Sequence, residues 1–186
     1  MYNGENMRKS VAWKTRLTKE MGRVEKLAVL GVGNVLKGDD AVGVRTIEAL
    51  RTLVGPQPCP KLLLLAAYEV PENYTGKIRD FQPTHTLIID AVSASWPAGT
   101  VFVVDPRDLP DADISTHRTS LSVLARFLET TMRCRVLMLG VEPEEFLSGR
   151  GLTPAVQDAA EAISRYLAGF VRRRLRSSSA SERRYS

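Results

Sequence analysis

The sequence predicts an α/β protein, a three-layer α/β/α sandwich built on a mainly parallel, twisted sheet of five strands. Its 186 residues fit one domain of ordinary size. Short continuous apolar runs indicate strands that are buried on both faces, as in a parallel sheet. These runs alternate with segments of helical period, and that alternation implies crossover connections between parallel strands.

Five apolar runs supply the predicted strands, at 26–31, 61–67, 85–92, 100–104 and 135–141. The first run reads Lys-Leu-Ala-Val-Leu-Gly, and Gly31 and Gly33 then permit a tight turn out of the strand. The third run delivers Asp90 near its C-terminal end. In open α/β sheets functional groups gather just beyond these ends, so the polar residues there are the candidates for a site.

Apolar residues at helical spacing predict four helices, at 42–54, 71–80, 121–132 and from 154 to 171. Ser115 or Thr116 is the expected N-cap of the third helix, which places His117 in its first turn. Thr153 followed by Pro154 is typical of the start of a helix and predicts where the last one begins.

Charge divides the chain into three parts: an N-terminal extension at 1–25, a domain at 26–171, and a basic, disordered tail at 172–186. The formal net charge is +5, but the tail carries +5 and the extension +3. The domain itself is therefore acidic, at −3. An acidic domain argues against nucleic acid as a partner, which would have to bind through the arginines of the tail.

The cysteines and the apolar runs indicate a cytoplasmic protein without a membrane partner. Cys59 and Cys134 lie far apart in sequence and lack the spacing of a zinc site or a redox pair. The longest apolar run, at 62–67, is far shorter than the roughly 20 residues that span a bilayer.

A nucleotide site is a weak interpretation of the first glycine motif, Gly31-Val-Gly-Asn-Val-Leu36. Leu36 stands where a dinucleotide-binding loop has its third glycine, and no P-loop sequence follows. Two other classes of site remain open from the residues: a non-enzymatic metal- or nucleotide-binding module, and an enzyme.

Two carboxylates and an imidazole are expected at one edge of the sheet. Asp39 and Asp40 begin the first helix, where one of them can cap free N–H groups. Asp40, Asp90 and His117 come from three different loops and make a set of oxygen and nitrogen donors that suits nickel, zinc or iron. His85 starts the third strand, at the opposite end from Asp90, and is expected to be structural.

Five motifs follow one another along the chain: GVGNVLKGDDAVGV, LIIDAV with PAGTV, DPRDL with STHRTSL, LGVEPEEF and GLTPAV. Together they resemble the nickel-iron hydrogenase maturation endopeptidases, and the runs VPENYTGKIRDFQPTH and DPRDL to STH resemble the subgroup that serves hydrogenase-3-like enzymes. They cover residues 26–171. The sequence departs from the family at Ala41, where glycine is usual, and at Glu142, where glutamine is frequent.

The resemblance implies an enzyme that removes a C-terminal extension from a hydrogenase large-subunit precursor once nickel is inserted. Nickel would be carried by that precursor, the protein partner, and no organic cofactor is expected. By motif position Asp40, Asp90 and His117 match the family's metal-binding residues. Asp40, Asp39 and Asp90 are the candidate catalytic residues, with Asp39 as a proton acceptor. We expect a monomer. A nickel-independent endopeptidase resembling the germination proteases is the enzymatic alternative.

Overall fold

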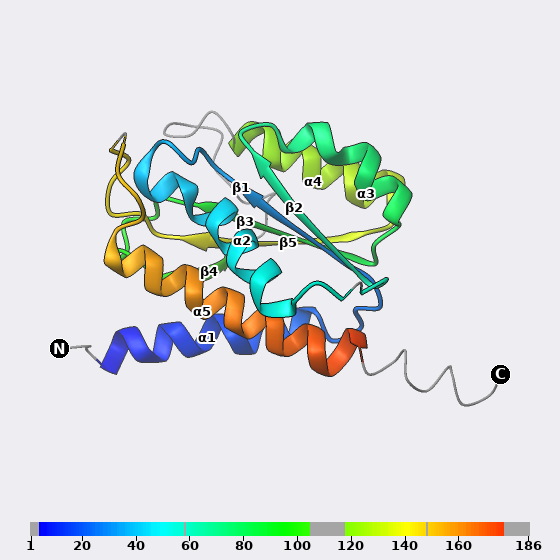
Figure 1. The fold of residues 1–186 in the computed structure, drawn as a ribbon, viewed down its shortest axis with the longest axis horizontal. Coiled ribbons are helices and arrows are strands. Elements are labelled where there is room, and N and C mark those ends of the chain that lie inside the picture. The colour runs from blue at the N-terminus through cyan, green and yellow to red at the C-terminus, as the bar shows by residue number, and fades with distance from the viewer. Residues whose placement is uncertain (1–3, 58, 105–117, 148, 177–186) are drawn as a thin grey trace.

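Five strands with helices on both faces form the computed structural model (Figure 1), which describes residues 4–57, 59–104, 118–147 and 149–176. The strands are β1 (Leu27–Val32), β2 (Leu62–Tyr68), β3 (His85–Ala91), β4 (Val101–Val104) and β5 (Arg135–Val141). Their order in the sheet is β2-β1-β3-β5-β4, and only β4 runs antiparallel to its neighbour. The predicted fold class and all five strands are confirmed.

The helices form the two outer layers of the sandwich. They are α1 (Gly4–Glu20), α2 (Val42–Val54), α3 (Thr75–Phe81), α4 (Arg118–Met132) and α5 (Pro154–Phe170), with short helical turns η1 (Gly38–Ala41), η2 (Pro71–Tyr74) and η4 (Val171–Arg176). Figure 1 shows α1, α2 and α5 on one face of the sheet and α3 and α4 on the other. No helix within the described residues is both long and apolar enough to cross a membrane.

Alternate residues of the central strands fill two separate cores, which explains their continuous apolar character. Val29 and Leu87 are register partners and face the core beneath α1, α2 and α5. Leu30 and Ile88, one position later on each strand, face the core beneath α3 and α4. The two central strands are therefore held from both sides.

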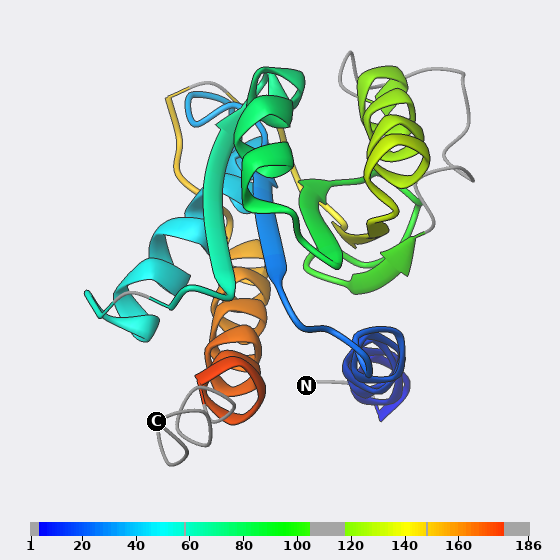
Figure 2. The same cartoon turned by 90° about the vertical axis from the view of Figure 1, so that its right-hand side faces the viewer.

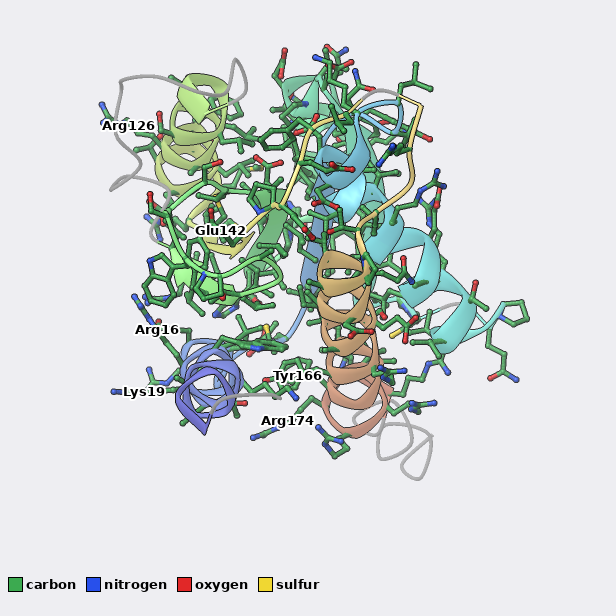
Figure 3. All side chains as sticks on the ribbon, turned by 90° about the vertical axis from the view of Figure 1, so that its left-hand side faces the viewer. Arg16, Lys19, Arg126, Glu142, Tyr166 and Arg174 are labelled. Carbon is green, nitrogen blue, oxygen red and sulfur yellow. The ribbon has the colours of Figure 1, made fainter. Side chains whose placement is uncertain are left out.

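The N-terminal extension contains a helix that packs on the domain (Figure 2). Trp13, Leu17 and Met21 recur every four residues, so they share one face of the helical path, and all three are buried in the core. Figure 3 shows Tyr166 between α5 and α1, where its ring contacts Trp13 edge to face. The Tyr166 hydroxyl lies 2.6 Å from Thr18 Oγ1. Both helices thus share polar as well as apolar contacts.

The helical path of α5 continues beyond the domain boundary expected from sequence. In η4, Leu175 is buried in the same core as α5. The guanidinium of Arg176 donates hydrogen bonds to the carbonyl oxygens of Val54 and Gln57, at 2.7 and 3.1 Å. Residues 172–176 of the predicted tail are thus packed on the domain, and residues 177–186 lie outside the described part of the chain.

The first turn of α2 contacts two strands directly at Gly43. A Cβ added there would lie 2.2 Å from the carbonyl oxygen of Ile89 and 2.4 Å from that of Val32. Both contacts are to strand backbone, which cannot move without disturbing the sheet. Glycine is therefore required at this position for α2 to begin at the edge where β1 and β3 end.

We expect Gly43→Ala to lower the free energy of unfolding by about 3 kcal/mol, because the new methyl group overpacks against strand backbone. Gly76→Ala is the matched control, since a Cβ added at Gly76, in α3, meets no atom within 4 Å. That change should stabilise the protein by about 0.5–1 kcal/mol through helix propensity. Urea unfolding of both variants checks the prediction, and equal midpoints would contradict the close approach.

Candidate functional site

The candidate site lies at the edge of the sheet where the parallel strands end, which is the edge seen in Figure 3. Asp39 and Asp40 lie in η1, directly after the loop that leaves β1. Asp90 is the penultimate residue of β3, the strand that pairs with β1. The structure thus brings the predicted aspartates to one edge. His117 lies outside the described residues.

Asp40 is held at the turn that joins β1 to α2. Its Oδ2 accepts a hydrogen bond of 2.8 Å from the backbone N–H of Asn34, and its Oδ1 has no hydrogen-bond partner among the described residues. Gly33 has φ +127, and a Cβ there would lie only 1.7 Å from the Asp40 carbonyl oxygen. Ala41, the departure from the family pattern, has φ −73, so its side chain causes no backbone strain. The half-buried Asp40 carboxylate keeps one oxygen for a ligand.

Asp90 is almost fully buried, with 1% of its surface exposed. Its Oδ1 accepts a hydrogen bond of 2.9 Å from the backbone N–H of Ala91. Asp90 pairs with Gly140 of β5 in the sheet, so its position between β1 and β5 is central. Functional groups of open α/β sheets gather at this edge, so the position of Asp90 favours a role in binding.

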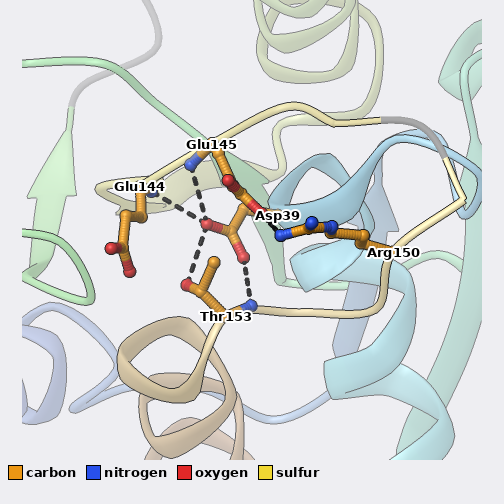
Figure 4. A network of polar contacts seen from close by, with 5 residues as sticks. All are labelled: Asp39, Glu144, Glu145, Arg150 and Thr153. Carbon is orange, nitrogen blue, oxygen red and sulfur yellow. Dashed lines mark hydrogen bonds and ion pairs between the residues drawn. The ribbon is translucent and has the colours of Figure 1, made fainter.

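Asp39 is fully buried, and its carboxylate holds the loop between β5 and α5 (Figure 4). Its Oδ2 accepts hydrogen bonds from the backbone N–H groups of Glu144 and Glu145, at 2.8 and 3.2 Å, and from the Thr153 hydroxyl at 3.0 Å. Its Oδ1 accepts the Thr153 N–H at 2.7 Å. The carboxylate makes no side-chain cap to α2, the helix that follows it. These contacts favour a role in positioning the loop.

Glu142 is a second buried carboxylate at this edge, with 5% of its surface exposed (Figure 3). It follows β5, and its Oε2 accepts a hydrogen bond of 2.7 Å from the Ala94 N–H in the loop between β3 and β4. Its backbone bonds to Gly99 and Thr100 of the same loop. The sequence marks Glu142 only as a departure from the family's usual glutamine, so this contact was not predicted.

We expect Glu142→Ala to destabilise the protein by about 1–3 kcal/mol, because the Ala94 N–H loses its acceptor. Glu142→Gln should cost less than about 1 kcal/mol, since the amide oxygen of glutamine can accept the same bond. Thermal unfolding of the two variants measures the difference. If glutamine is as harmful as alanine, the charge of Glu142 matters rather than its hydrogen bond.

Exposed apolar side chains lie at or after the C-terminal ends of all four parallel strands, the edge of the sheet that also carries the carboxylates. Leu36 follows β1 and is 69% exposed, and the other members of this apolar rim are Tyr68, Val70, Trp96, Phe146 and Leu147. The loops of Leu36 and Leu147 are neighbours, since the Gly149 N–H donates a hydrogen bond of 3.0 Å to the Leu36 carbonyl. Large apolar side chains that gather on one surface indicate a site for another protein.

The described residues do not by themselves complete a metal site. Among them, no three His, Cys, Asp or Glu side chains are grouped so that they could hold a metal ion. Asp40 and Asp90 remain two carboxylates of the kind that accept a hard or borderline cation. His85 lies buried at the start of β3, and burial together with the nearby Arg135 charge lowers its pKa.

These features define an α/β/α protein whose candidate functional carboxylates lie at the C-terminal edge of its parallel strands, where such sheets carry their sites. The sequence matches the hydrogenase maturation protease family over residues 44–168. The chain belongs to this family, which is a family of endopeptidases.

Known relatives agree with this assignment. A Methanocaldococcus jannaschii protein assigned as a hydrogenase maturation protease is 30% identical over 135 residues, which cover 70% of this chain and 80% of that protein. The hydrogenase 3 maturation protease of Escherichia coli is 28% identical and is covered to 88%, against 76% of this chain. The structure of a nickel-iron hydrogenase maturation protease from Thermococcus kodakarensis superposes with a TM-score of 0.77 at 26% identity, covering 84% of this chain and 99% of that one.

Proposed function

We propose that the protein removes the C-terminal extension of a nickel-iron hydrogenase large-subunit precursor after nickel has been inserted. The observation that carries the proposal is the pair Asp40, in the turn η1 that follows β1, and Asp90, near the end of the neighbouring strand β3, in a chain of the maturation protease family. Both carboxylates lie at the edge where a protein substrate can reach the sheet.

The apolar rim supports a folded protein as the substrate. Trp96, Phe146 and Leu147 expose large side chains on loops around the carboxylates, and such surfaces gain free energy when a partner covers them. Hydrogen bonds also fix these loops. Asp39 accepts bonds from the loop between β5 and α5, and Glu142 accepts one from the loop between β3 and β4. A preorganised rim lowers the entropy that docking would otherwise cost.

Nickel enters this reaction as cargo of the precursor. Asp40 and Asp90, with His117 as the third donor, supply the oxygen and nitrogen atoms that nickel accepts in proteins. We assign these three residues to recognition of the nickel-loaded precursor, so that only a completed subunit places its C-terminal extension beside the carboxylates. A carboxylate at this edge can accept a proton from the attacking water.

We place the reaction in the cytoplasm. Both cysteines, Cys59 and Cys134, are free, which agrees with a reducing compartment. Burial raises the pKa of the Cys134 thiol, so it stays protonated at neutral pH.

The test is intact-mass analysis of a nickel-loaded large-subunit precursor incubated with the protein, beside the same precursor without nickel. Loss of a C-terminal fragment only from the nickel-loaded precursor is the expected result. Cleavage of both forms would favour the nickel-independent endopeptidase. No cleavage of either form, with stoichiometric nickel bound to the isolated protein, would favour the metal-binding module.

A further inference from the structure

A cavity lined by polar and charged residues lies at the opposite edge of the sheet from the candidate site, where β3 and β5 begin. It has a volume of about 430 Å³, and its lining residues come from the end of α1, from the starts of two strands and from the turn before β5: Lys19, Glu20, Arg23, Thr84, His85, Arg133 and Arg135. The length of β3 separates this cavity, which lies at His85, from Asp90 near the other end of the strand. The cavity is therefore independent of the candidate active site.

Positive charge in this cavity exceeds negative charge. Four of the lining side chains are cationic, and Glu20 is the one carboxylate. Glu20 forms an ion pair with Arg135. Lys19, Arg23 and Arg133 have no ion-pair or hydrogen-bond partner for their charged groups among the described residues, so the positive charge is left uncompensated. Three such cations on one concavity attract an anion.

Two further lining residues leave the ligand to the cationic side chains. His85 is buried, and burial together with the adjacent Arg135 charge lowers its pKa, so the imidazole adds no positive charge at neutral pH. The Thr84 hydroxyl is occupied by Lys26, donating to its carbonyl and accepting from its N–H. The cationic side chains are thus the groups left to bind a ligand.

Arg133 occupies a backbone position that favours glycine. It directly follows α4 and has φ +51, the left-handed conformation with which helices commonly end. Arginine is less favourable than glycine in this conformation. Strain of this kind often accompanies functional positions, and here it places a cation at the cavity.

We propose that this cavity binds a small multivalent anion of the phosphate class, held by Lys19, Arg23 and Arg133. The volume suits a ligand the size of pyrophosphate or a small phosphorylated metabolite, and several phosphate oxygens match several cationic donors. This inference does not depend on the proteolytic function. Lys19 lies in the last turn of α1 and Arg23 follows that helix. Binding here would therefore link the end of α1 to the starts of β3 and β5.

The test is titration calorimetry of the full chain with inorganic pyrophosphate. Arg133→Gly should weaken binding by about tenfold, because it removes one cation from a multivalent contact. The same variant should unfold at an equal or higher temperature, because glycine suits the left-handed position. Lys19→Gln combined with Arg23→Gln should weaken binding further. The control is Arg126→Gln, an exposed arginine on α4 that lies well away from Lys19 in Figure 3 and is not part of the cavity.

Three outcomes would overturn the proposal: no binding of pyrophosphate, unchanged binding by the cavity variants, or equal weakening by Arg126→Gln. A hexaglutamate peptide that binds more tightly than pyrophosphate, and loses affinity in the same variants, would assign the cavity to an acidic protein segment instead. Cleavage of the precursor is measured separately, so failure of one proposal is distinguishable from failure of the other.

Discussion

Asp40→Asn and Asp90→Asn are each expected to slow cleavage of the nickel-loaded precursor by about 10³-fold, within the range seen when a positioned acid or base is removed. Asparagine keeps an oxygen that can accept the hydrogen bonds from Asn34 and Ala91, so the backbone around each site should hold its place. What is lost is the negative charge, which both metal recognition and proton transfer require.

The measurement is a time course of intact mass with each variant, accompanied by a thermal melt. Asp80→Asn is the matched control, because Asp80 is an exposed carboxylate on α3 whose contact with Arg79 is long, at 3.9 Å. It should cleave at the normal rate. Normal cleavage by both Asp40→Asn and Asp90→Asn would rule out these carboxylates as the site, whatever the family of the chain.

The sheet was predictable because its signals are local. Each central strand is a continuous apolar run, and each of the four predicted helices shows its period within its own sequence, whereas the helix α1 in the N-terminal extension was not predicted. The orientation of β4 was not predictable in the same way. It depends on the pairing of Val101 with Val141, which are forty positions apart, rather than on any pattern inside the strand.

The candidate site was predictable in part for the same reason. Asp90 ends an apolar run and Asp40 begins a helix, so strand ends alone bring them to one edge. Their roles came from the resemblance to a family, because the residues by themselves left several metals and two classes of protein open. The hydrogen bond of Glu142 could not be predicted from the sequence, because its partner Ala94 lies 48 positions earlier.

Asp39 shows most clearly which contacts cannot be predicted from the sequence. The sequence offered local explanations for it, a helix cap or a proton acceptor beside Asp40. Its carboxylate oxygens accept hydrogen bonds from groups 105 to 114 positions away, at Glu144, Glu145 and Thr153. Only the folded chain brings the loop after β5 to the turn after β1, so no periodicity or motif could have indicated these bonds.

Asp39→Ala is therefore expected to lower the free energy of unfolding by about 3 kcal/mol, because it removes a fully buried carboxylate and leaves the N–H groups of Glu144 and Thr153 without their acceptor. Asp39→Asn should also be strongly destabilising, since its NH₂ group would face one of these N–H donors. Thr153→Val is the matched control. It removes a single donor, the hydroxyl, and should cost about 1 kcal/mol.

Urea unfolding beside the cleavage assay separates the two roles open to Asp39. If Asp39 positions the loop, Asp39→Ala lowers the stability and the cleavage rate together. Cleavage should then recover partly at low temperature, where the variant stays folded. If Asp39→Ala unfolds at the same urea concentration as the parent while cleavage is lost, Asp39 acts in the chemistry as a proton acceptor. Four hydrogen bonds to a carboxylate with no exposed surface make the first outcome the expected one. A carboxylate already accepting from four donors has little remaining capacity to take a proton from water.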